Sequence, residues 1–428
     1  MVAESPLKTL GQKIAFSTLV QYLGKGTQMV LAYFVIKLIS NFFAAADYGI
    51  YGKITEYALF FSTLANLGIF ANVVRKMSEA PHDGKLFVNA LFLRIFSALV
   101  FFVTAVLALF IFGKDPVFIF GVTIFLGTLF FDYITSVCDG MLQANYLMGR
   151  ATIALTLGKL LQFGIIYYLV KLSGFVPDLS LIPLVLAATV LSSVFTAGLS
   201  LFFVSRKIKL VFELDKKFMW TILKTSIVFG LINIVNNLYF RFLPDYFASR
   251  VLDDAGFASF NIAFHISQVL SLASTFLVFS FLPGFKQYIE NKHFEKARKV
   301  YRTITQILLV LALLLFFSGV FLGPQVIAFV THEKYVLTEL GFLLPLMLIL
   351  AGVSYFYDLI LITIFAFEKE LWQLKREALA LIVALVFFFS SLLFADSQTR
   401  LLLIFIGAIL AEVLIVILGG LKVRKLLS

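Results

Sequence analysis

Long apolar runs separated by short polar segments repeat along the whole chain. A run of about 20 apolar residues can cross the hydrocarbon core of a bilayer as a helix. The runs predict helices at residues 13–40, 50–74, 86–112, 117–145, 151–171, 181–204, 218–243, 255–282, 300–322, 340–367, 376–394 and 401–421. The pattern therefore predicts an all-α integral membrane protein with about twelve transmembrane helices and almost no soluble domain.

Composition agrees with this interpretation. Of 428 residues, 61% are hydrophobic and 14% are charged, whereas soluble domains carry about 25% charged residues. The net charge of +11 is dispersed among short loops, so it does not indicate a nucleic-acid partner. Most of the 35 lysine and arginine residues lie in alternate loops. The positive-inside rule then predicts a multi-pass protein of the cell's inner, cytoplasmic membrane, with both termini in the cytoplasm.

The segment 205–218 is the longest charged loop near the middle of the chain. It predicts two six-helix lobes, residues 1–210 and 211–428. Residues 47–50 and 254–257 have similar sequences and lie at the start of the second predicted helix of each lobe. An even number of helices per lobe makes such a repeat parallel, as in some transporters.

Several kinds of enzymatic site are missing from the sequence. No G-x-x-x-x-G-K-[ST] phosphate loop is present, so no nucleotide hydrolysis by that route is expected. The four histidines show no metal-ligand spacing and the one cysteine has no companion, so no metal is expected. There is also no G-x-S-x-G elbow. We therefore expect a protein that is not an enzyme, with no catalytic residues and no cofactor.

Charged and polar residues inside the predicted spans are the functional candidates, because placing them in lipid is costly. Gln21, Lys25 and Gln28 are spaced i, i+4, i+7 and form one polar face of the first helix. The alternative is a structural lysine paired with an acid of a neighbouring helix. The further candidates for a cavity are Lys53, Arg94, Asp132, Asp139, Lys159 and Arg241. Together they predict a basic, water-filled cavity that takes an anionic substrate.

Two isolated acids lie in predicted spans of the second half, Asp358 and Glu412. A lone carboxylate in a membrane helix can bind a coupling cation, either a proton or sodium. It can equally lie in a hydrated crevice with its charge solvated.

Short sequence patterns across nearly the whole chain resemble one family of membrane proteins. They are residues 47–52 (DYGIYG), 65–70 (ANLGIF), 74–76 (VRK), 142–146 (LQANY), 253–257 (DDAGF) and 281–283 (FLP). Their order resembles the polysaccharide (O-antigen type) flippases of the multidrug/oligosaccharidyl-lipid/polysaccharide exporter superfamily. Two positions depart from that family: Lys37 stands near a usual arginine, and Tyr239, Phe240 and Arg241 stand where many members carry an acid.

The resemblance implies two lobes that form a V-shaped alternating-access transporter. Its partners would be the bilayer, a lipid-diphosphate-linked oligosaccharide moved from the inner to the outer leaflet, and a coupling cation. A drug/cation antiporter of the same superfamily is the first alternative, disfavoured by the predicted basic cavity. An integral-membrane glycan polymerase or ligase is a second one, although the outer loops are short for a catalytic site.

Overall fold

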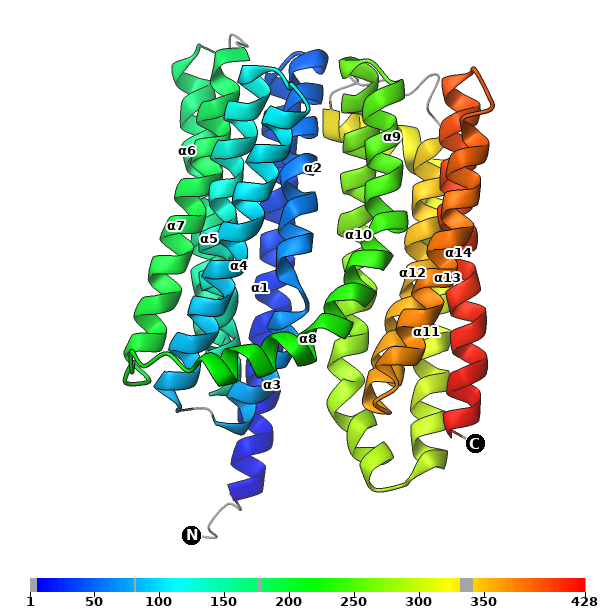
Figure 1. Ribbon diagram of the computed structural model, residues 1–428. Coiled ribbons are helices and arrows are strands. Elements are labelled where there is room, and N and C mark those ends of the chain that lie inside the picture. The colour runs from blue at the N-terminus through cyan, green and yellow to red at the C-terminus, as the bar shows by residue number, and fades with distance from the viewer. Residues whose placement is uncertain (1–5, 81, 146, 175–178, 332–341, 428) are drawn as a thin grey trace. The chain divides into compact units, whose positions relative to one another are not determined.

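The computed structural model describes residues 6–80, 82–145, 147–174, 179–331 and 342–427 (Figure 1). This part of the chain is helical and contains no strand. Its elements are α1 (Pro6–Phe42), α2 (Ala45–Asn66), α3 (Ile69–Glu79), α4 (Gly84–Ile111), α5 (Pro116–Ala144), α6 (Met148–Leu172), η1 (Leu179–Leu181), α7 (Ile182–Ser205), α8 (Lys216–Asn237), η2 (Leu238–Phe242), α9 (Leu243–Val251), α10 (Asp254–Glu290), α11 (Phe294–Thr331), α12 (Leu343–Ala366), α13 (Glu370–Ser391) and α14 (Ser397–Leu427).

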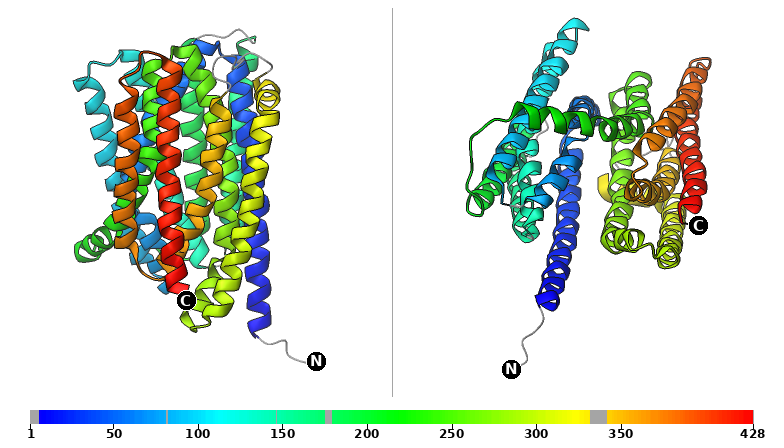
Figure 2. Two further views of the ribbon diagram at one scale, coloured as in Figure 1. Left: turned by 90° about the vertical axis from the view of Figure 1, so that its right-hand side faces the viewer. Right: turned by 60° about the horizontal axis from the view of Figure 1, so that its bottom comes forward.

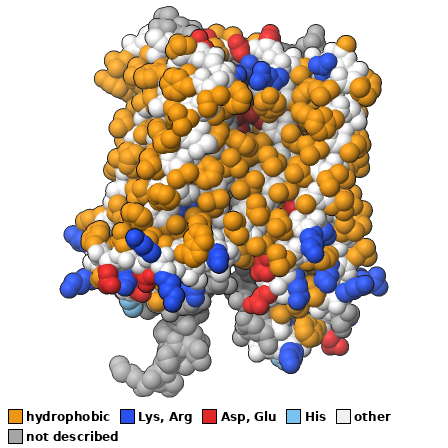
Figure 3. Space-filling model, viewed as in Figure 1, with side chains coloured by type: hydrophobic (Ala, Val, Ile, Leu, Met, Phe, Trp, Pro, Cys, Tyr) orange, Lys and Arg blue, Asp and Glu red, His pale blue; other side chains and the backbone are white. Residues whose placement is uncertain are grey.

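The predicted all-α membrane fold is confirmed, since each predicted span corresponds to helix in the described residues. Eight helical segments in this part of the chain are long and apolar enough to cross a membrane. Large apolar side chains such as Ile111 (79% exposed) and Phe389 (61% exposed) lie on the outside of the helices. A belt of such side chains covers the middle of the face in Figure 3, with lysine and arginine towards the ends. These are surfaces for lipid.

Two predicted spans are interrupted. The span 50–74 is broken between α2 and α3, where Leu67 (φ 45°) and Gly68 (φ 67°) adopt left-handed backbone conformations. A Cβ on Gly68 would lie 2.4 Å from the backbone nitrogen of Gly230, so this close approach requires glycine. The span 218–243 contains α8 followed by the π-helical segment η2, which leads into α9. Neither interruption shows in the hydrophobic pattern, because apolar residues continue through both.

The chain divides into two compact units, Met1–Gly230 and Leu231–Ser428. In the first unit α5 packs against α4 and α7, and α1 packs against α6. In the second, α12 packs against α10, α11 and α14, and α13 packs against α14. The first unit extends past Leu210 because the beginning of α8 contacts α3. There Asn72 Nδ2 donates to the Ile222 carbonyl at 3.3 Å and to Ser226 Oγ at 3.2 Å.

Short polar caps fix where the long helices begin. Asp115 Oδ1 accepts from the Val117 nitrogen at 2.7 Å and Pro116 follows it, which together start α5. At the start of α14 an oxygen of Asp396 accepts from the Thr399 nitrogen at 2.7 Å. The backbone and side-chain hydrogen bonds from Thr399 hold the pKa of Asp396 below its usual value. The caps position the polar residues of α5 and α14 along their helices.

Candidate functional site

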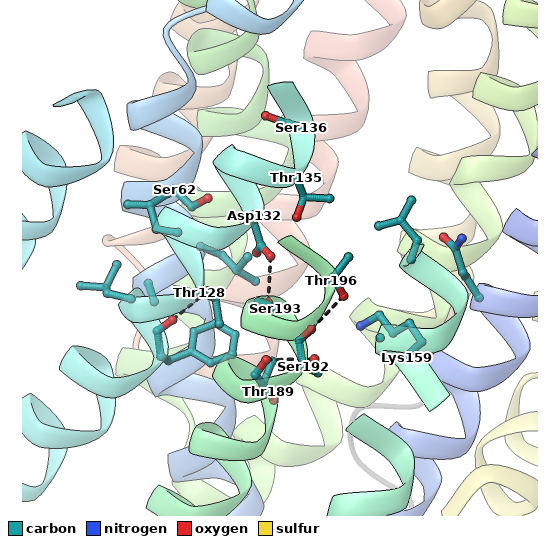
Figure 4. A pocket seen from close by; sticks show the side chains of 18 of the residues that line it. Ser62, Thr128, Asp132, Thr135, Ser136, Lys159, Thr189, Ser192, Ser193 and Thr196 are labelled. Carbon is teal, nitrogen blue, oxygen red and sulfur yellow. Dashed lines mark hydrogen bonds between the residues drawn. The ribbon is translucent and has the colours of Figure 1, made fainter. Parts of the chain in front are cut away.

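A pocket of about 400 Å³ lies inside the first unit (Figure 4). Its lining comes from α1, α2, α5, α6 and α7. The polar side chains of the lining are Gln28, Ser62, Thr128, Asp132, Thr135, Ser136, Asp139, Lys159, Thr189, Ser192, Ser193 and Thr196. A cavity of this volume is within the range of small-molecule binding sites.

Four residues predicted from the sequence line this pocket: Gln28, Asp132, Asp139 and Lys159. They come from three helices, α1, α5 and α6, which the fold brings together around the pocket. The other predicted residues lie elsewhere. Lys53 on α2 and Arg94 on α4 are not in the lining, Arg241 belongs to the second unit, and the side chains of Gln21 and Lys25 on α1 lie outside the described residues.

The hydroxyl groups of the pocket are mostly oriented by their own helices. Five hydroxyls donate to backbone carbonyls three or four residues earlier, at 2.8–3.0 Å. They belong to Thr128, Thr135, Ser136, Ser192 and Thr196. A hydroxyl has one hydrogen, so a group that donates it to the backbone offers only acceptor lone pairs to the cavity. The wall therefore favours a ligand rich in hydrogen-bond donors.

The charged groups of the pocket add acceptors. Asp132 is exposed to the cavity and its Oδ1 accepts from Ser193 Oγ at 2.8 Å (Figure 4). Asp139 Oδ1 is buried and has no hydrogen-bond partner among the described residues. Lys159 Nζ donates to Gln162 Oε1 at 3.0 Å. The described lining thus holds two carboxylates and one ammonium group, whereas the sequence predicted a basic cavity.

Arg94 has a different role from the one expected at the sequence level. Its side chain is 3% exposed, and Nη1 donates to Asn66 Oδ1 at 2.8 Å and Nη2 to Ser136 Oγ at 3.2 Å. The guanidinium carbon lies 3.7 Å from the centre of the Tyr133 ring. These contacts join α4 to α2 and α5, which makes Arg94 a packing residue behind the pocket.

A second polar cluster is buried in the second unit. Glu377 on α13 and Glu412 on α14 are both fully buried. The Tyr239 hydroxyl lies 2.8 Å from Glu412 Oε2 and 3.2 Å from Glu377 Oε2. One hydroxyl hydrogen serves only one carboxylate at a time, and Glu412 Oε1 has no hydrogen-bond partner in the described part of the chain. The cluster can therefore accept a further hydrogen or a small cation.

A polar chain leads from this cluster along α13. Gln373 Nε2 donates to Glu377 Oε1 at 2.7 Å, and Arg376 Nη2 donates to Gln373 Oε1. The guanidinium carbon of Arg376 lies 3.4 Å from the centre of the Trp372 ring. The predicted coupling acid Glu412 is in the cluster, whereas the Asp358 carboxylate accepts from Ser274 Oγ at 2.8 Å.

Glu377 is the candidate that the sequence reasoning missed. The predicted span begins at residue 376, next to Glu377, whereas α13 begins at Glu370. The spacing of Gln373 and Glu377, one helical turn apart, is the signal that could have found it. Tyr239 is one of the three residues at which the sequence departs from the family that it resembles, and its hydroxyl lies 2.8 Å from Glu412 Oε2. Among the described residues, no group of three or more His, Cys, Asp or Glu side chains could hold a metal ion.

A sequence model of one protein family matches residues 10–289 of the chain. Its description is "Polysaccharide biosynthesis protein". None of the curated protein sequences compared with the chain is significantly similar to it.

Solved structures similar to this one are transporters of the MOP superfamily. An inward-facing multidrug resistance MATE family transporter has a TM-score of 0.73 at 15% identity, over 96% of this chain and 98% of that one. An outward-facing transporter of the same kind has a TM-score of 0.70 at 17% identity, over 97% and 96%. A MOP superfamily transporter from Pyrococcus furiosus has a TM-score of 0.70 at 16% identity, over 97% of this chain and 96% of that one. That transporter is described as having a binding pocket of reversed polarity, which suggests a different function. At these identities the likeness establishes the fold.

Proposed function

Because the chain belongs to the polysaccharide biosynthesis protein family, we propose that it moves a lipid-diphosphate-linked oligosaccharide from the inner to the outer leaflet of the cytoplasmic membrane. The movement would occur by alternating access, with both termini in the cytoplasm and without catalysis or a cofactor. The observation that carries the proposal is the acceptor-rich pocket of the first unit. Sugars present many hydroxyl donors, and the pocket offers hydroxyl oxygens and two carboxylates to receive them.

The pocket would hold sugar units of the oligosaccharide. Asp132 and Asp139 would accept from sugar hydroxyls. Charge-assisted hydrogen bonds of this kind are stronger than neutral ones. Lys159, held by Gln162, would offset part of the negative charge and keep the Thr189 side of the network in place. The diphosphate would be attracted by Lys25, which the spacing of its neighbours places on a polar face of α1.

Movement would be coupled to a proton through the cluster of the second unit. Two buried carboxylates that approach the same hydroxyl are held together at a cost in free energy unless a proton or cation is shared between them. No group in the described residues supplies a full metal-ligand set there. We therefore propose that Glu377 and Glu412 bind the coupling proton together, and that Tyr239 orients it.

A drug/cation antiporter is the second candidate. One specific observation favours it: the described lining of the pocket carries two carboxylates and a single ammonium group, which suits a cationic ligand as well as a sugar. The two candidates differ in what they do with a neutral glycan, so one experiment separates them.

The test uses purified protein in liposomes that contain a fluorescent oligosaccharide on a lipid diphosphate. Transport is measured by quenching with a membrane-impermeant reductant. We expect glycan movement by the wild type, loss in Lys25→Ala and Lys25→Glu, partial activity in Lys25→Arg, and full activity in the exposed-surface control Lys296→Ala. Export of a cationic dye without any glycan movement would favour the antiporter and exclude the flippase. Full activity of Lys25→Ala would remove the diphosphate role of Lys25.

A further inference from the structure

The segment that follows α7 and the beginning of α8 carry a group of exposed side chains that the pocket of the first unit does not use. We define the α8 strip as the exposed side chains of residues 206–227. In it Phe212 is 83% exposed and Trp220 is 60% exposed. Large aromatic side chains with this exposure need a partner, because water solvates them poorly.

The first part of α8 runs across the end of the first unit rather than along its other long helices (Figures 1 and 2). It is fixed there by side-chain contacts. Asn72 of α3 donates to Ser226 Oγ at 3.2 Å, and the Lys85 ammonium lies 2.8 Å from Glu213 Oε1. Lys85 stands at the beginning of α4, where the apolar span of that helix starts. The α8 strip therefore lies at the level where the membrane-spanning part of the first unit ends.

The two faces of this part of α8 have opposite environments. Ile222 and Ser226 are buried against the unit. Lys217, Trp220 and Lys224 recur at intervals of three and four residues on the other, exposed face. The Lys224 ammonium lies 5.9 Å from the centre of the Trp220 ring. Basic and aromatic residues on one face of a helix are typical of helices that lie in the membrane interface.

The charge of the α8 strip is strongly positive. Residues 206–224 contain six basic and two acidic side chains. Both acids are engaged: Glu213 pairs with Lys85, and Asp215 Oδ1 accepts from the Phe218 nitrogen at 2.9 Å as the cap of α8. The acids therefore do little to offset the lysines of the exposed face.

We propose that the α8 strip binds the headgroups of anionic phospholipids, with Trp220 inserted at the boundary between headgroups and acyl chains. The partner must supply negative charge to the lysines and apolar surface to Trp220 and Phe212, and an anionic bilayer surface supplies both. On this proposal the first part of the predicted span 218–243 lies on the membrane instead of crossing it.

The experiment uses Trp220 as its own probe. The chain has two tryptophans, so Trp372→Phe leaves Trp220 as the only one. The full-length variant is placed in nanodiscs of phosphatidylcholine with a fixed fraction of phosphatidylglycerol, and bromine is attached near the headgroup end of the acyl chains of either lipid. We expect bromine to reduce Trp220 fluorescence, more strongly on phosphatidylglycerol than on phosphatidylcholine. High salt should remove the difference, because the attraction is electrostatic.

Two further variants make the result specific. Lys216→Gln, Lys217→Gln and Lys224→Gln together should abolish the preference for phosphatidylglycerol, whereas the matched exposed set Lys292→Gln, Lys296→Gln and Lys299→Gln in the second unit should leave it unchanged. Quenching by aqueous iodide without quenching by brominated lipid would overturn the proposal, because the face would then be solvated. Equal quenching by the two brominated lipids would overturn the anionic selectivity.

Discussion

The two units bury polar groups in opposite ways. In the first unit Asp132 is exposed to a cavity of about 400 Å³ and is surrounded by hydroxyl groups. In the second unit Glu377 and Glu412 are fully buried and contact Tyr239 and Gln373 directly. A ligand with many atoms fits the first environment, and only a proton or small cation fits the second. We therefore propose that the first unit binds the substrate and the second unit binds the coupling proton.

The physical reason lies in the packing partners of each carboxylate. Around the pocket the packing partners are small: Gly158 of α6 and Ser192 of α7 both line it. Around the carboxylates of the second unit, Tyr239, Tyr357 and Ile415 fill the space in a common core with Ala380 and Ala411. Acids placed in the filled environment are compensated by neutral donors and, at Glu377, by Arg376, which reaches it through Gln373.

The largest expected effect is at the buried carboxylates. Glu412→Gln should reduce proton-driven transport to background while ligand affinity of the first unit stays unchanged, because the amide keeps the shape and cannot release a proton. Removing one of two neighbouring carboxylates should not lower the free energy of unfolding. Liposomes with an imposed proton gradient measure the transport, and calorimetric titration with glycan measures the ligand affinity.

Asp358→Asn is the matched control for this prediction. Asp358 accepts a hydrogen bond from Ser274 Oγ at 2.8 Å. The Tyr239 hydroxyl approaches Glu412 and Glu377 instead, so Asp358→Asn should keep most of the gradient dependence. Unchanged proton dependence in both Glu412→Gln and Glu377→Gln would exclude the cluster from coupling.

Arg94→Ala should show the next largest effect, on stability instead of binding. It removes hydrogen bonds to Asn66 and Ser136 and the contact with the Tyr133 ring. Losing such a buried network costs about 3 kcal/mol of unfolding free energy. Thermal unfolding in detergent should report the loss, and Arg94→Lys should recover only part of it because an ammonium lacks the planar fork. A stable Arg94→Ala protein with weakened glycan binding would place Arg94 in the ligand site after all.

Gly158→Ala should reduce the pocket itself. A Cβ at this position would lie 1.9 Å from Thr196 Oγ1, so that hydroxyl must move away from its present position. We expect glycan affinity to fall by about tenfold, equivalent to about 1.4 kcal/mol. Gly164→Ala on the same helix is the control, since a Cβ there meets nothing within 4 Å. Adding Thr196→Ala to Gly158→Ala should restore thermal stability without restoring affinity, and equal affinities of the two single glycine variants would show that ligand does not occupy this pocket.

The hydrophobic pattern predicted the helices well because each bilayer-spanning segment must be apolar over its own length, a local requirement. The break at Gly68 was not predictable, since it depends on Gly230, far away in sequence. At the site level, Asp132, Asp139 and Lys159 were found because charge inside an apolar run is visible locally. The net charge of the pocket could not be predicted, because it depends on which helices pack around the cavity.

A substitution of Lys159 should have the smallest effect on ligand affinity. It tests whether the first-unit pocket binds sugar alone or phosphate as well. The sequence placed Lys159 among the candidates for a cavity that takes an anionic substrate. In the structure Lys159 Nζ donates to Gln162 Oε1, and Gln162 Nε2 donates to Thr189 Oγ1 at 2.9 Å. If its role is to hold this network, Lys159→Met should weaken the free oligosaccharide and the diphosphate-linked one to the same extent, by a few-fold. The loss should be small because in this role Lys159 acts on the ligand only through Gln162 and Thr189, and the rest of the wall remains. Titration calorimetry with both ligands measures the two affinities. A loss confined to the diphosphate-linked ligand would return Lys159 to the headgroup and make the first-unit pocket a mixed site for sugar and phosphate.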